Sequence, residues 1–113
     1  MTSQGSASGR FTRAIGQRNL FAAEAALKEM GNPSLLAALD YLALLAEERP
    51  AKFVGAALRW HARFESEAVV LTLTESQYAL SALAALGEGD KKAVDVLRSL
   101  LRKVRPTLSP RVG

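Results

Sequence analysis

Apolar residues recur every three or four positions in six segments of the chain, which is the spacing of one face of an α-helix. Phe11, Ala14 and Ile15 show this spacing in the first segment. In the second segment the predicted inner stripe consists of Leu20, Ala23, Leu27 and Met30, widened by Phe21. The predicted helices cover residues 9–17, 19–30, 35–46, 50–68, 74–86 and 90–105.

Glycine, proline and capping residues mark the boundaries between these helices. Gly31 is placed to end the second helix, because glycine adopts a left-handed backbone without steric cost. Pro50 blocks continuation of the third helix and begins the fourth. Thr74 and Gln77 match a capping box at the start of the fifth helix. The β-branched stretch 69–73 before it is expected to be a connection buried against the core.

The third predicted helix, 35–46, is apolar on nearly all sides and therefore belongs at the centre of a bundle. Asp40 carries its only charge, and an isolated buried carboxylate is costly. We favour a position for Asp40 on a narrow exposed strip of this helix. The alternative is an ion pair with an arginine of a neighbouring helix.

These elements predict an all-α fold: a compact bundle of about six short antiparallel helices, arranged as stacked hairpins or as an orthogonal bundle. The 20 alanines and 18 leucines support helix over sheet. One helical domain is expected over residues 10–105 of the 113-residue chain. It lies between a disordered arm, 1–9, and a flexible tail, 106–113.

Two resemblances support a helical fold. The stretch 11–33 resembles one helical hairpin of the tetratricopeptide (TPR) family, with Arg18, Asn19 and Leu20 at its turn, and with Ala23 and Leu27 where the family has a small and a large apolar residue. Met30 departs from that pattern, Pro33 comes earlier than the family's proline, and the next two helices do not repeat it. The chain also resembles a class of short Ala- and Arg-rich proteins of high-GC bacteria that contain a segment like 59–64, Arg-Trp-His-Ala-Arg-Phe. That resemblance implies a helical fold and no particular function.

The sequence contains no recognisable catalytic or metal-binding constellation. Cysteine is absent, so neither disulfides nor thiolate ligands exist, and a cytoplasmic location is the simplest expectation. His61 is the only histidine, and we expect it to form a surface pair with Glu65. Ser76 and Ser81 lack a partner base in the pattern and are expected at the surface or at a cap. We therefore predict a protein that is not an enzyme and that binds no cofactor or metal.

An aromatic stripe on the fourth helix is the first candidate binding surface. Phe53, Trp60 and Phe64 share one helical face, with Arg59 and Arg63 beside it. Two further apolar residues, Val54 and Leu58, flank this face. Core packing is the favoured interpretation of the three rings. The alternative is a partner-binding groove, because Trp, Phe and Arg are frequent anchors of protein interfaces.

A basic face on the last helix is the second candidate. Residues 91–111 hold seven of the chain's 15 basic residues and one of its 11 acidic residues. The basic face consists of Lys91, Arg98, Arg102 and Arg105, and Lys103 lies at the same end of the molecule. A solvated face is the favoured interpretation, and binding to phosphates of a nucleic acid is the alternative.

The sequence thus predicts a non-enzymatic helical module that binds another protein or a second copy of itself. A nucleic-acid-associated protein is the alternative. No apolar run of about 18 residues is present, so we expect no membrane span.

Overall fold

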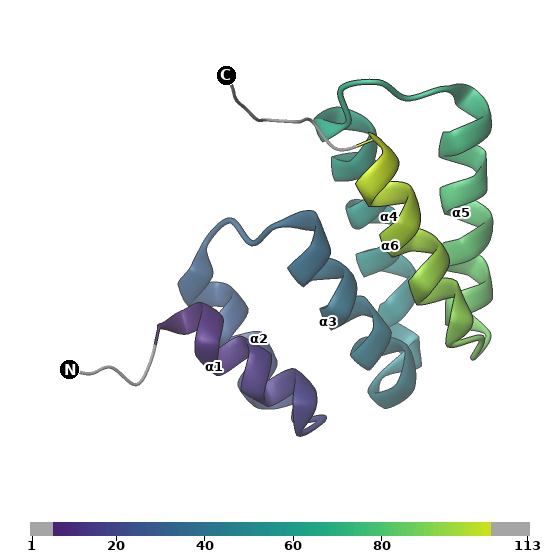
Figure 1. Ribbon diagram of the computed structural model, residues 1–113. Coiled ribbons are helices and arrows are strands. Elements are labelled where there is room, and N and C mark those ends of the chain that lie inside the picture. Colours follow the sequence, from purple (N-terminus) through teal and green to yellow (C-terminus); the bar gives the residue numbers. More distant parts are fainter. Residues whose placement is uncertain (1–5, 105–113) are drawn as a thin grey trace, which may run out of the picture.

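The computed structural model describes residues 6–104, and within that range the chain forms six α-helices and no β-strand (Figure 1). The helices are α1 (Ala7–Gly16), α2 (Leu20–Met30), α3 (Leu35–Glu48), α4 (Pro50–Glu67), α5 (Leu73–Gly87) and α6 (Lys92–Val104). The predicted all-α fold is confirmed. Residues 6–9 of the predicted arm instead belong to α1 and its cap, because Ser6 accepts a hydrogen bond from the Gly9 N–H and the helix begins at Ala7. Residues 1–5 and the whole predicted tail, 106–113, lie outside the described residues.

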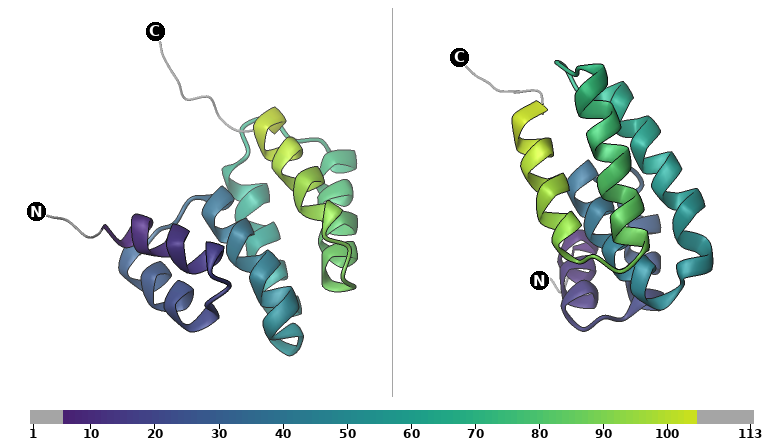
Figure 2. Two further views of the ribbon diagram at one scale, coloured as in Figure 1. Left: turned by 60° about the horizontal axis from the view of Figure 1, so that its bottom comes forward. Right: turned by 90° about the vertical axis from the view of Figure 1, so that its right-hand side faces the viewer.

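Helices α3 to α6 form a closed four-helix bundle. Each of them packs against the next in the chain, and α6 returns to pack against α3. The hairpin of α1 and α2 is attached to this bundle through α3 alone. Figures 1 and 2 show the hairpin on one side of α3 and helices α4, α5 and α6 on the other. The arrangement is therefore a bundle with one appended hairpin, in which α3 is the shared element.

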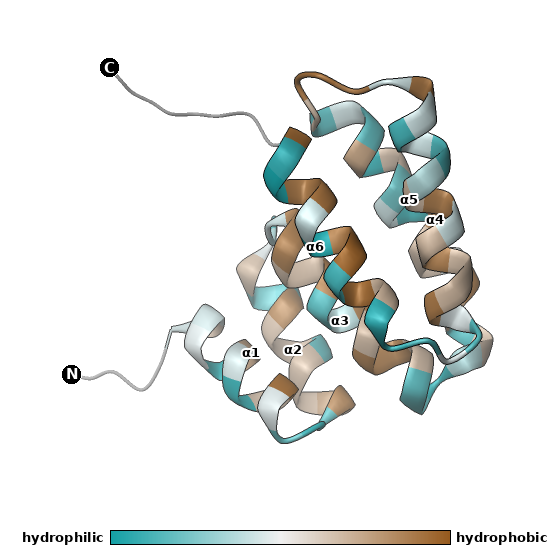
Figure 3. Cartoon of the chain, turned by 45° about the vertical axis from the view of Figure 1, so that its right-hand side comes forward, coloured by the Kyte–Doolittle hydropathy of each residue, from teal (hydrophilic) through white to brown (hydrophobic). Residues whose placement is uncertain are grey.

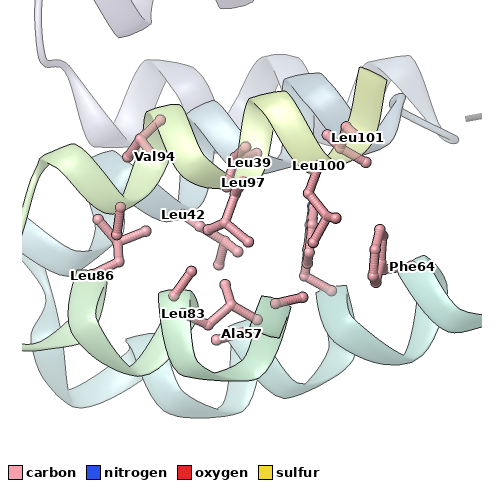
Figure 4. Close-up of a cluster of buried hydrophobic side chains, with 14 of the residues drawn as sticks. Leu39, Leu42, Ala57, Phe64, Leu83, Leu86, Val94, Leu97, Leu100 and Leu101 are labelled. Carbon is pink, nitrogen blue, oxygen red and sulfur yellow. The ribbon is translucent and has the colours of Figure 1, made fainter. Parts of the chain in front are cut away.

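Two hydrophobic clusters hold this arrangement together, and α3 contributes to both. In the larger cluster, Leu39, Leu42 and Leu45 of α3 meet apolar side chains of α4, α5 and α6 (Figure 4). Leu39 and Leu97 are completely buried there. In the smaller cluster, Leu44 of α3 meets four residues of the hairpin, namely Phe11, Ala14, Ala23 and Ala26. The prediction that α3 is the central helix is correct.

Polar contacts also tie the hairpin to the bundle. The Tyr41 hydroxyl of α3 donates a hydrogen bond to Glu24 of α2 at 2.7 Å. Partial burial and the adjacent Glu24 carboxylate raise the pKa of Tyr41 from 10.0 to about 12. At the C-terminal end of α3, Glu47 pairs with Arg18 of the α1–α2 turn and with Lys91, the residue before α6. Partial burial raises the pKa of the Glu47 carboxyl, but the hydrogen bonds from Lys91 and Arg18 have the larger combined effect, so the pKa lies below its ordinary value.

The start of α5 differs from the prediction. The capping box is formed by Thr72 and Glu75, whose side chains each accept a hydrogen bond from the other residue's backbone N–H. A charged carboxylate at this position suits the helix N-terminus better than the amide that was predicted. Helix α5 consequently begins at Leu73, one residue before the predicted cap.

The earlier start of α5 shortens the connection from α4, and the expectation that this connection is buried is wrong. Val69 and Val70 are about 70% exposed, and Leu73 is 85% exposed. Only Leu71 of this stretch packs against the core. Figure 3 shows the resulting hydrophobic colour along the exposed connection between α4 and α5.

The predicted inner stripe of α2, which consists of Leu20, Ala23, Leu27 and Met30, packs against the core, but its predicted widening by Phe21 is wrong. Phe21 is 83% exposed, whereas Ala23 and Ala26 are buried. Two residues along a helix correspond to about 200°, so Phe21 points away from the face on which Ala23 lies. The small alanine side chains let α1, α2 and α3 approach closely, and Gly31 ends α2 with a positive φ of 74°, as predicted.

Of the helices in residues 6–104, none is both long enough and apolar enough to cross a membrane.

The contact between α5 and α4 at Gly87 gives a testable prediction. A Cβ atom at position 87 would lie 2.8 Å from a ring carbon of Phe53, which is itself buried. Gly87→Ala should therefore lower the free energy of unfolding by about 1–3 kcal/mol, because the ring has to shift within a packed core. Urea unfolding followed by circular dichroism would measure this.

Gly55→Ala on α4 is the matched control. Its Cβ atom would meet only the guanidinium of Arg59, at an ordinary contact distance of 3.5 Å. This substitution should raise the unfolding free energy by about 0.5–1 kcal/mol, since alanine favours a helix over glycine. Equal effects of the two substitutions would contradict the close packing of α4 on α5.

Candidate functional site

The aromatic stripe of α4 lies in the core and not at the surface. Phe53, Trp60 and Phe64 are 4%, 3% and 0% exposed. The Trp60 indole N–H donates to the Leu35 carbonyl at 2.9 Å, and its ring stacks on Phe64 with centroids 5.5 Å apart. The structure thus agrees with the core interpretation of the three rings. A partner could reach them only if the bundle opened.

The opposite side of α4 presents apolar groups to solvent. Val54 and Leu58 are 63% and 57% exposed. At about 100° per residue they point about 100° and 140° away from Phe53, toward the α5 edge of the helix. Ala51, Gly55 and Ala62 are exposed between this edge and the other.

The other edge of the same exposed surface is basic. Lys52 and Arg59 are both exposed there, and neither forms an ion pair with a carboxylate in the described part of the chain. Arg63, one turn further along this edge, pairs with Glu67 at 2.8 Å. The exposed side of α4 is therefore apolar along one edge and positively charged along the other.

Helix α5 extends the apolar edge. The hydrogen bond between His61 and Ser76 and the contact between Phe53 and Gly87 align α4 and α5 as antiparallel neighbours. In this alignment Leu80, which is 41% exposed, lies at the level of Leu58. We call Val54, Leu58 and Leu80 with Lys52 and Arg59 the outer α4 face.

The basic face of α6 is largely neutralised by carboxylates. Lys91 pairs with Glu47 at 3.2 Å, and Lys103 pairs with Glu75 at 3.3 Å. The Thr72 backbone hydrogen bond and the pairing with Lys103 lower the pKa of the Glu75 carboxyl, so this partner stays charged. Arg105 lies outside the described residues. Cations that already face carboxylates contribute less to the neutralisation of phosphates.

Asp40 forms an ion pair with an arginine of a neighbouring helix, which was the alternative to an exposed strip on α3. Its carboxylate accepts a hydrogen bond from Arg98 of α6 at 2.5 Å, and Arg98 also lies 3.6 Å from Asp95. The Asp40 side chain is 30% exposed, so the pair lies at the edge of the bundle. Arg98 is consequently an internal ion-pair partner of α3 as much as a surface cation.

A buried polar cluster joins α4 and α5, and sequence reasoning missed it. His61 and Ser76 are 8% and 6% exposed, which corrects the expectation that both lie at the surface. His61 Nε2 lies 3.0 Å from the Ser76 carbonyl oxygen and 3.1 Å from Ser76 Oγ. Ser76 Oγ donates to Glu65 at 2.5 Å. Ser76 lies three and seven residues before the buried Ala79 and Leu83, so helical spacing places it on the core face of α5.

The geometry of this cluster does not match a nucleophile and its base. The Ser76 carbonyl can only accept a hydrogen bond, so His61 Nε2 carries the hydrogen and has no free lone pair for the serine hydroxyl. Glu65 contacts Ser76 Oγ directly, while its other oxygen remains 4.0 Å from His61 Nδ1. A catalytic triad instead needs the carboxylate to orient the histidine and the histidine to accept the serine proton. The cluster is best understood as satisfied polar packing between two helices.

A groove at the end of the bundle where α3 begins and α4 and α6 end is a further candidate site. It has a volume of about 510 Å³ and lies between the first turn of α3 and the last turns of α4 and α6. Its lining is largely apolar, with Asp40, Arg98, Glu67 and Arg102 as its charged members. No pattern along the chain predicts this groove, because it depends on how three helix ends meet.

In residues 6–104 there is no group of three histidine or acidic side chains placed to hold a metal ion. No match to the chain was found among models of known protein families, curated protein sequences or solved structures.

The buried cluster predicts a specific cost for loss of the Ser76 hydroxyl. Ser76→Ala should lower the free energy of unfolding by about 1–3 kcal/mol, because it removes a partner of both His61 and Glu65. Ser81→Ala on the exposed side of α5 is the control and should change it by less than about 0.5 kcal/mol. Thermal and urea unfolding of both variants would measure the difference, and a neutral Ser76→Ala would contradict a buried, satisfied cluster.

Proposed function

We propose that the domain is a non-enzymatic protein-interaction module whose docking surface is the outer α4 face. The observation that carries this proposal is that the side chains of Val54 and Leu58 are more than half exposed next to Lys52 and Arg59, two cations without an ion pair in the described part of the chain. Apolar residues gathered on a surface frequently mark binding sites. The buried rings of Phe53, Trp60 and Phe64 lie on the opposite side of α4 and pack it against the core.

The charges on this face indicate the chemistry of the partner. An amphipathic helix lying along α4 would set its apolar residues on Val54, Leu58 and Leu80. Acidic residues on its flank would then meet Lys52 and Arg59, and this complementarity favours the correct orientation and speeds association. The small side chains of Ala51 and Ala62 leave room for the partner backbone to approach.

Burial energies are consistent with a reversible interaction. Full burial of one Val or Leu side chain contributes about 1.5–3 kcal/mol, and Val54 and Leu58 have a little over half of their surface left to bury. They would therefore contribute about 1 kcal/mol each, before ordering costs. A partner needs further contacts with Leu80 and with the basic edge to bind in the micromolar range.

Leu58→Glu tests this surface without touching the core. Tagged wild-type protein and the variant would be used to recover partners from the native cell, with quantitative mass spectrometry. We expect a specific protein whose recovery falls at least about tenfold with Leu58→Glu, because a carboxylate would be placed between apolar groups and against an acidic partner. The partner's binding should also weaken when Lys52 and Arg59 are changed to glutamate.

Phe21→Glu is the matched control. Phe21 is an even more exposed apolar residue, but it lies on the α1–α2 hairpin. Recovery of the partner should be unchanged by this substitution. Light scattering of the purified wild type would reveal whether the partner is a second copy of the chain. If every recovered protein were equally insensitive to both substitutions, or equally sensitive to both, the outer α4 face would not be the docking surface.

A further inference from the structure

The groove between α3, α4 and α6 combines an apolar lining with one cation, Arg102, that has no carboxylate partner within residues 6–104. Leu36, Phe64, Leu101 and Val104 contribute to the lining, and Leu36 is 48% exposed at its edge. A volume of about 510 Å³ lies within the range of small-molecule sites. The groove is built by helix ends that do not take part in the outer α4 face.

The charged residues of the groove are paired with one exception. Asp40 is paired with Arg98 at 2.5 Å, and Glu67 is paired with Arg63 at 2.8 Å. Arg102 is exposed, and its hydrogen bond to Ser99 Oγ at 3.1 Å is with a neutral group. In the described residues Arg102 has no carboxylate partner. The first turn of α3 lies beside the same groove and adds the partial positive charge of a helix start.

We infer that this groove binds a medium-chain aliphatic carboxylate. The acyl chain lies along Leu35, Leu36 and Ala68, the apolar lining residues that are exposed at least in part, and the carboxylate faces Arg102. One uncompensated cation beside one apolar groove matches one anionic group attached to one apolar chain. A peptide would bring many N–H and C=O groups, whereas the polar side chains of Asp40 and Glu67 already have partners.

The chain contains its own reporter for this site. Trp60 is the only tryptophan. Its ring stacks on Phe64, and its indole N–H donates to the carbonyl of Leu35, and both of these partners line the groove. A ligand in the groove therefore changes the surroundings of Trp60 through residues in direct contact with it.

The test uses the full chain and three probes: decanoate, decanol and acetate, all kept below the concentration at which they aggregate. Trp60 fluorescence and calorimetry should show one saturable site for decanoate. Decanol should bind at least about tenfold more weakly, because it lacks the charge that faces Arg102, and acetate should not bind detectably. Equal binding of decanol and decanoate would overturn the assignment.

Variants separate the groove from non-specific adsorption and from the outer α4 face. Arg102→Gln should weaken decanoate at least about tenfold and leave decanol unchanged, whereas Arg13→Gln on α1 should affect neither. Leu36→Ser should weaken both chain-bearing probes. Leu58→Glu, which removes the proposed docking surface, should leave decanoate binding intact.

Several results would overturn the inference. The first is decanoate binding that is unchanged in Arg102→Gln. The second is decanoate binding that is lost in Leu58→Glu but retained in Arg102→Gln. The third is a change in Trp60 fluorescence that does not saturate. Binding of an acidic apolar peptide to the groove in the absence of any decanoate binding would also reject it, in favour of a protein occupant. Because Arg102 and Leu36 are exposed at least in part, circular dichroism should show both variants folded.

Discussion

The structure depends on the burial of α3 from two sides. Leu39, Leu42 and Leu45 face the closed bundle, and Leu44 faces the hairpin, so one helix carries residues of both hydrophobic clusters. A helix apolar on nearly all sides is stable in water only when neighbours cover it all round. Five other helices contact it here within the described residues, and the two ion-paired carboxylates Asp40 and Glu47 lie at partly exposed positions of α3.

The candidate surfaces follow from this central position. Because α3 occupies the interior, α4 covers it with one face, which carries the aromatic rings, and turns the other face outward with Val54 and Leu58. Helix α6 closes the bundle beside α3 and pairs its Arg98 with Asp40. Where the ends of α3, α4 and α6 meet, an apolar groove with Arg102 at its edge remains. Both surfaces are therefore consequences of how one central helix is covered.

Sequence periodicity predicted the helices and the central position of α3, because both reflect spacing along one helix. It could not predict properties that depend on contacts between helices. Two threonines, Thr72 and Thr74, each fitted a capping box, and the structure uses Thr72 with Glu75. The hydrogen bonds of Ser76 with His61 and Glu65 depend on the packing of α5 on α4. The partners of Asp40, Lys91 and Lys103 are likewise set by the packing of α6 on α3 and α5.

The candidate sites show the same limit. The sequence favoured core packing for the stripe of Phe53, Trp60 and Phe64 on α4 and left a partner-binding groove as the alternative, because only the neighbouring helices decide between the two. Val54 and Leu58 carried the only available signal, since they lie off the aromatic face by about 100° to 140°. The groove near Arg102 left no pattern in the sequence, because its lining comes from three helix ends that are distant along the chain.

Hydrogen exchange of the backbone amides, measured by mass spectrometry or NMR, would test the central role of α3 most directly. We predict that α3, α4, α5 and α6 exchange slowly and as one unit. Helices α1 and α2 should open more readily, because their cluster consists mainly of alanines with Phe11 and Leu44. Fast exchange in α3 while the α1–α2 hairpin stays protected would contradict the account.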